Sequence, residues 1–183
     1  MLRVVVVVLL FLLVCSFGFA QVPKGNVFFG YSYDHMSVVS NDAINTNGWD
    51  ASLEGKLIPF LGLLVDVDGH YGSGTFLAGC SGGICAYSGA DVAEHNVLLG
   101  PRASFQVGAF RPFAEVLVGA SHISRSNGIS DSDTSFANAV GGGLDYRIAG
   151  PVSVRGQLDW IETRFFSNTQ SGVRFSTGIA IHF

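Results

Sequence analysis

Apolar and polar side chains alternate along most of this chain with a period of two. The clearest case is the last segment, VRFSTGIAIHF at residues 173–183, where every second residue from Val173 is apolar or Thr and those between are small or polar. Successive side chains of a strand point to opposite faces. The segment therefore predicts a strand with one apolar and one polar face.

The same period recurs from end to end, and no stretch sustains the 3.6-residue apolar period of an amphipathic helix. We expect little helix and eight strands of about ten residues each. The predicted strands are residues 26–35, 49–57, 61–71, 93–105, 112–123, 136–148, 152–162 and 172–183.

The predicted connections alternate between long and short. Polar or Gly-rich loops follow the first, third, fifth and seventh strands, and short turns follow the second, fourth and sixth. This is the loop pattern of transmembrane barrels. In hydrocarbon every backbone group must be paired within the protein, so the last strand must pair with the first. The fold class predicted is all-β, an eight-stranded antiparallel up-and-down transmembrane β-barrel with both termini on the short-turn side.

The N-terminus predicts export. Residues 1–20 contain Arg3, an apolar run from Val4 to Cys15, and small residues at Gly18 and Ala20, as in a cleavable signal peptide. The alternative, an uncleaved anchor, needs about 20 apolar residues, more than the run provides. We therefore expect a signal peptide at 1–20 and one barrel domain at 21–183.

Composition and charge agree with a lipid-facing protein. Charged residues make up 13% of the chain, against about 25% in soluble domains. The net charge of −4 argues against nucleic acid as a partner. A soluble lipocalin-like ligand-binding barrel is the alternative with the apolar face inside, and the scarcity of charge disfavours it.

Charges in successive predicted strands fall on one face, which we assign to the barrel interior. An eight-stranded barrel is just wide enough for side chains to fill it, and buried charges need partners. We predict an internal ion-pair network, with a narrow cation-preferring pore as the alternative because acids outnumber bases. Its residues are Asp34, Asp50, Glu54, Lys56, Asp66, Asp68, Glu94, Arg102, Glu115, Asp145, Arg147, Arg155, Asp159 and Arg174.

Two cysteines remain after the signal peptide, Cys80 and Cys85 in CSGGIC. An exported chain meets an oxidising compartment, so we expect them to form a disulfide. A metal site would need further ligands at suitable spacing, and no metal or other cofactor is predicted.

The mature chain resembles the bacterial outer-membrane β-barrel family, the small barrels similar to the membrane domain of outer-membrane protein A. The resemblance rests on the signal peptide, the alternating segments and the stretches LLGPRASF, RPFAEVLVGAS, AVGGGLDYRI, VRGQLDW and RFSTGIAIHF. It implies location in the outer membrane and contact with its lipid. One departure from that family is expected, because no peptidoglycan-binding domain follows Phe183 in this sequence. The resemblance also implies that Phe175, Ile179, Ile181 and Phe183 are recognised by the barrel-assembly machinery. The polar loops are then the surface for an extracellular ligand.

One pair of residues suggests an enzyme. His122 and Ser124 in SHIS resemble the base and nucleophile of the lipid A deacylases, which are also outer-membrane barrels. Arg125 stands where those enzymes tend to have Asn, and the only downstream acids nearby are Asp131 and Asp133. We expect a non-enzymatic protein with a structural, surface-interaction or narrow porin-like role.

Overall fold

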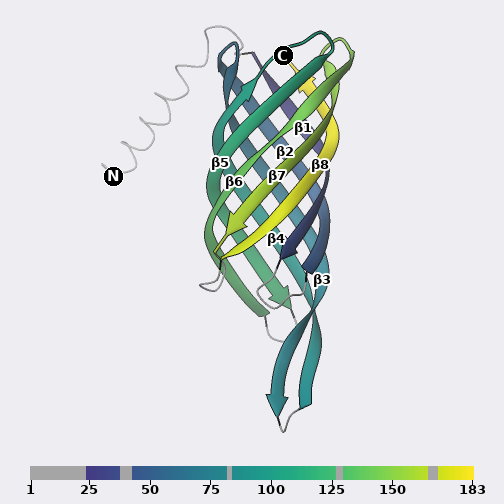
Figure 1. Ribbon diagram of the computed structural model, residues 1–183, viewed down its shortest axis with the longest axis vertical. Helices are drawn as coiled ribbons and strands as arrows, with labels where there is room; N and C mark the ends of the chain where they lie inside the picture. Colours follow the sequence, from purple (N-terminus) through teal and green to yellow (C-terminus); the bar gives the residue numbers. More distant parts are fainter. Residues whose placement is uncertain (1–23, 38–42, 82–83, 127–129, 165–168) are drawn as a thin grey trace, which may run out of the picture.

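The computed structural model describes residues 24–37, 43–81, 84–126, 130–164 and 169–183. Eight antiparallel strands form one closed barrel in sequence order (Figure 1). No helix in these ranges is long and apolar enough to cross a membrane. The strands are β1 (Gly25–Ser37), β2 (Ala43–Ile58), β3 (Leu61–Ser81), β4 (Ile84–Ser104), β5 (Phe110–Ser126), β6 (Ser130–Ala149), β7 (Val152–Thr163) and β8 (Gln170–His182).

The terminal strand closes the ring, as its alternating pattern predicted. β8 pairs with β1 from Asn26 opposite His182 to Ser37 opposite Ser171. The amide of Gly25 donates to the Phe183 carbonyl at 2.9 Å, and the amide of Phe183 donates to the Gly25 carbonyl at 3.0 Å. The backbone ladder therefore continues to the last residue of the chain.

The apolar face of the strands lies outside the barrel. In β1, Phe29 and Tyr31 point outward and are 63% and 50% exposed, whereas Asp34 points inward and is 2% exposed. The same alternation appears in β7, where Leu158 and Trp160 are exposed and Arg155 and Asp159 are buried. A lipocalin-like barrel has the opposite arrangement, so that alternative is wrong.

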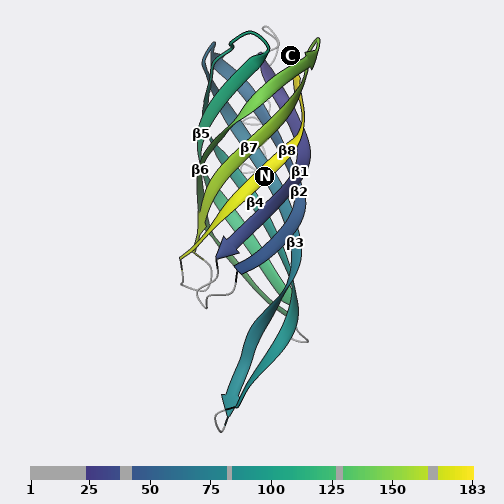
Figure 2. The same cartoon turned by 45° about the vertical axis from the view of Figure 1, so that its right-hand side comes forward.

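The prediction of a long Gly-rich loop around Cys80 and Cys85 is also wrong. β3 and β4 continue through this segment and pair from Leu61 opposite Ala103 to Ser81 opposite Ile84. The ladder between β2 and β3 ends at Tyr71 of β3, and the ladder between β4 and β5 ends at Asp91 of β4. Beyond these points β3 and β4 form a ribbon, residues 72–81 and 84–90, which projects from the barrel at the end away from the C-terminus (Figures 1 and 2). Gly and Ser weaken a strand but leave its backbone ladder intact.

The seam between β1 and β8 depends on a close backbone approach. Gly30 faces Gly178 across the two strands. A Cβ at Gly178 would lie against the Phe29 carbonyl oxygen and the Gly30 Cα, well inside van der Waals contact. The two strands can pair at this point because both residues lack a side chain.

We expect the substitution Gly178→Val to weaken closure. The branched side chain would push β8 away from β1, and the urea midpoint of detergent-refolded protein should fall, with less of the fast-migrating folded form on an unheated denaturing gel. Gly156→Val is the matched control on β7, because a Cβ there meets nothing within 4 Å. Equal midpoints for the two variants would contradict the proposed role of the seam.

Candidate functional site

The barrel interior contains nearly all the charges that the alternation assigned to it. Twelve of the fourteen residues are buried, and the Lys56 side chain is only 11% exposed. Arg147 differs: it is exposed, close to the short turn after β6, and lies outside the buried network. The network divides into two groups that differ in charge balance.

The first group, here called the turn-side cluster, comprises Glu54, Lys56, Arg102, Glu115, Asp145 and Arg155. Arg102 Nε donates to Glu115 at 2.5 Å, and Arg155 Nε and Nη2 donate to the two oxygens of Asp145 at 2.6 and 2.9 Å. Lys56 Nζ lies 2.6 Å from Glu54. Three acids and three bases neutralise one another, which satisfies the requirement that buried charges be paired.

Aromatic rings contact the arginines of this cluster. The Phe113 ring centroid lies 4.3 Å from the Arg102 guanidinium carbon and 4.8 Å from that of Arg155. Arg155 also lies 5.0 Å from the Phe28 ring. Cations are attracted to the faces of aromatic rings, more strongly when desolvated. The two like charges are therefore held inside the barrel in contact with the same aromatic ring.

The second group, the loop-side cluster, comprises Asp34, Asp50, Asp66, Asp68, Glu94 and Asp159 together with Arg174 and His70. Arg174 donates to Asp66 and Asp159 at 2.9 Å each and also to Asp68. His70 lies 3.0 Å from Asp68 through Nδ1 and 2.9 Å from Ser32 through Nε2. The cluster thus contains six carboxylates against one arginine and one histidine, and Arg174 pairs with three of them.

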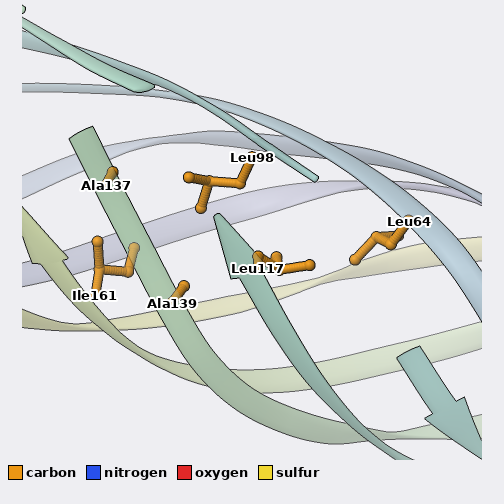
Figure 3. Packing of buried hydrophobic residues seen from close by; sticks show 6 residues of the cluster. All are labelled: Leu64, Leu98, Leu117, Ala137, Ala139 and Ile161. Carbon is orange, nitrogen blue, oxygen red and sulfur yellow. The ribbon is translucent and has the colours of Figure 1, made fainter. Parts of the chain in front are cut away.

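Gln157 connects the two clusters. Its side-chain amide donates to Glu115 at 3.1 Å and to Asp159 at 2.7 Å. Other interior positions hold neutral polar or apolar side chains, and Figure 3 shows six apolar side chains of β3–β7 lying within the ring of strands, namely Leu64, Leu98, Leu117, Ala137, Ala139 and Ile161. Ionic and apolar side chains together occupy the interior.

Several members of the network were not among the predicted site residues. His70, Asn26, Asn96 and Gln157 are all buried in the interior. The alternating pattern could have identified them, because each stands at an inward-facing position of its strand. They were missed because the prediction considered formal charges and left out neutral hydrogen-bonding side chains.

His122 and Ser124 lie at the outer surface near the end of β5. Ser124 Oγ is 3.3 Å from His122 Nε2, so the structure brings the two side chains together. His122 Nδ1 faces Thr134 Oγ1 at 2.7 Å, where a hydrolase triad has a carboxylate. The structure therefore fits a barrel with a structural or surface role better than the deacylase alternative.

The remaining predicted positions are on the ribbon and the last strand. The register places Cys80 directly opposite Cys85. Phe175, Ile179, Ile181 and Phe183 are 41–50% exposed on the outer face. Among the residues described, no group of three or more His, Cys, Asp or Glu is arranged to hold a metal ion.

Comparison with solved structures identifies the fold. Neisserial surface protein A is 13% identical, with 87% of this chain and 97% of that one covered and a TM-score of 0.67. The Yersinia pestis attachment invasion locus protein Ail, in complex with the heparin analogue sucrose octasulfate, is 12% identical, with 89% and 100% covered and a TM-score of 0.62. Pseudomonas aeruginosa OprG is 9% identical, with 89% and 97% covered and a TM-score of 0.58.

No protein-family model and no curated protein sequence matches the chain. At these identities the structural likeness identifies the fold, which is that of small bacterial outer-membrane β-barrels. The expected resemblance is confirmed at that level.

We expect Arg174→Met to destabilise the barrel by about 3 kcal/mol or more, because removing one partner of a buried ion pair leaves the other uncompensated. Urea unfolding of detergent-refolded protein measures the change. Arg147→Met removes an exposed arginine and is expected to change stability by less than about 0.5 kcal/mol. Similar losses in both variants would contradict the central role of Arg174.

Proposed function

We propose that this chain is an integral outer-membrane protein whose interior is closed by ion pairs and whose activity is interaction at the cell surface through the β3–β4 ribbon. The observation that carries the proposal is the contrast between the filled barrel and the projecting ribbon (Figures 1 and 2). Three lines of support follow.

Many exposed side chains on the outer face of the barrel are apolar, as expected for contact with lipid hydrocarbon. Leu53, Val118, Phe136 and Trp160 are 50–60% exposed on four different strands. In water such a surface is costly, whereas in a bilayer it matches the acyl chains. The exposed alternate residues of β8 that end at Phe183 are the proposed recognition signal for the barrel-assembly machinery.

The interior suits a closed barrel. Arg102, Arg155 and Arg174 are at most 1% exposed and each is paired with at least one carboxylate. Opening an aqueous path would separate these pairs or require them to exchange partners. A structural plug is therefore favoured over a steady pore.

The ribbon suits recognition of an extended strand. On the β2 side, no described strand pairs with β3 between Ser73 and Ser81. Edge strands are normally protected by charges, and residues 72–90 contain none. An exposed edge of this kind can accept a further strand through backbone hydrogen bonds.

A disulfide between Cys80 and Cys85 would stabilise this ribbon. An isolated pair of strands is marginally stable in water. The direct cross-strand pairing of the two cysteines supports the bond, which would close the end of the ribbon farthest from the barrel. We therefore include the disulfide in the proposal.

A sulfated polysaccharide is a less suitable partner for this chain. Ail was solved with a heparin analogue, and binding of such polyanions calls for clustered Lys and Arg. At the long-loop end the described strand ends of this chain carry Arg125 and Arg164 against a larger set of acids, namely Asp91, Asp131, Asp133 and Glu162. An uncharged polypeptide segment fits the ribbon better.

In a planar bilayer, refolded protein is expected to give no steady conductance, because the paired side chains fill the interior. Single-channel recording in potassium chloride measures this, with an unheated gel confirming that the sample is folded. Steady, cation-selective openings from folded protein would contradict a closed interior and support the porin-like alternative.

Removing the ribbon is expected to abolish peptide binding without unfolding the barrel. The probe is a phage library of random twelve-residue peptides selected on detergent-solubilised protein, followed by affinity measurement for selected peptides. A variant with residues 73–90 replaced by a short turn should lose binding at least about tenfold. Replacing both cysteines by Ser should weaken binding, because the ribbon is then less ordered.

The control variant replaces residues 38–42 with Gly and Ser at equal length and should bind as the original chain does. Selected peptides that bind the ribbon-deleted variant equally well would contradict the ribbon as the interaction element. Unchanged binding by the double-serine variant would contradict a stabilising disulfide.

A further inference from the structure

The loop-side cluster has more negative charge than its own residues can neutralise. Its six carboxylates are at most 2% exposed, and Arg174 forms ion pairs with three of them, Asp66, Asp68 and Asp159. Even a protonated His70 leaves an excess of negative charge. Isolated ionised carboxylates are very costly to bury, so further positive charge is required.

The unpaired atoms in this cluster are nearly all oxygen acceptors. Asp50 is fully buried and neither of its carboxylate oxygens has a hydrogen-bond partner. One side-chain oxygen of each of four further residues is also buried without a hydrogen-bond partner, namely those of Asp34, Asp66, Asp159 and Asn96. The Asn96 side chain donates to Asp68 at 2.8 Å, which leaves its carbonyl oxygen facing the interior.

The register brings several of these groups into one row. Asp50 lies opposite Asp68, and Asp68 lies opposite Asn96, across β2, β3 and β4. Asp50 is also close enough to Asp66 and Arg174 for direct electrostatic interaction. The unpartnered carboxylate of Asp50 therefore belongs to the oxygen-rich side of the cluster.

A proton does not satisfy this set as well as a cation does. A proton can neutralise a carboxylate, but it cannot be taken up by the amide oxygen of Asn96. Carboxylate and carbonyl oxygens together are the ligands that hard cations prefer. A tightly coordinated divalent ion needs several convergent ligands, and the described acids and histidines do not form such a group.

We infer that the loop-side cluster binds a small monovalent cation, sodium or potassium, between Asp50 and the facing oxygens of its neighbours. The cation acts as a second counter-charge beside Arg174. The turn-side cluster, with equal numbers of acids and bases, needs none. This inference does not depend on the role of the ribbon.

The test is the stability of detergent-refolded protein in different chloride salts at constant ionic strength. Sodium or potassium is expected to raise the urea midpoint above that in N-methylglucamine, whose cation is too large to enter the cluster. The effect should grow with the logarithm of the cation concentration above the dissociation constant, and the unfolding equilibrium should shift about tenfold at ten times that constant. Constant ionic strength separates binding from general screening.

Asp50→Asn removes the unpartnered charge and is expected to abolish the difference between the salts. Asp91→Asn is the matched control, since Asp91 is exposed on the outer face and the variant should retain the full difference. If Asp50→Asn fails to fold, sodium-23 line broadening on the unaltered protein, reversed by added potassium, gives an independent measurement.

Equal stability of the unaltered protein in all three salts, with no sodium-23 broadening, would overturn the inference. So would a difference between salts that survives in Asp50→Asn. A midpoint that rises on acidification to the same extent in every salt, with no difference between cations, would mean that protons neutralise the cluster, which also overturns it. Any of these results leaves the peptide-binding experiment unaffected.

Discussion

The pairing of β1 with β8 is the constraint on which the rest of this structure depends. A sheet in hydrocarbon has no water to satisfy its edges, so the ladder must close on itself. Closing eight strands leaves an interior just large enough for side chains. Inward residues are then buried whether or not they are charged. The ion pairs of Arg102, Arg155 and Arg174 are thus a consequence of ring size, since any charge on that face must find a partner within the ring.

The two halves of the interior meet this demand differently. Near the short turns, acids and bases are equal in number and Phe113 contacts two guanidinium groups. Toward the long loops, Arg174 is shared among Asp66, Asp68 and Asp159 while Asp50 has no hydrogen-bond partner. In the first arrangement the formal charges balance within the cluster. The second depends on what enters from solution, so the stability of the outer half is linked to the ionic medium in a way that the inner half is not.

The alternation of side chains and of loop lengths was sufficient to predict the strand number and the closed topology, and the scarcity of charge on the whole chain was needed to predict which face points inward. The alternation also placed Asp66 and Asp68 correctly. It could not predict that β3 and β4 continue past Tyr71 and Asp91, since Gly and Ser give no alternating pattern and the ribbon is held by backbone pairing. Arg147 shows a different limit. It stands two residues after the buried Asp145 and so on the same face of the strand, but it lies near the strand end, where it is exposed. The alternation indicates on which face of the strand a residue lies, but not how far along the barrel it lies.

The continuity of the ribbon with β3 sets how far from the membrane a partner meets this protein. From Gly72 to Ser81 the strand extends ten residues past its last pairing with β2, a reach of up to about 33 Å at about 3.3 Å per residue. That length is comparable to the hydrocarbon thickness of a bilayer. A partner much wider than the barrel can therefore dock on the tip without its bulk being pressed against the lipid head groups.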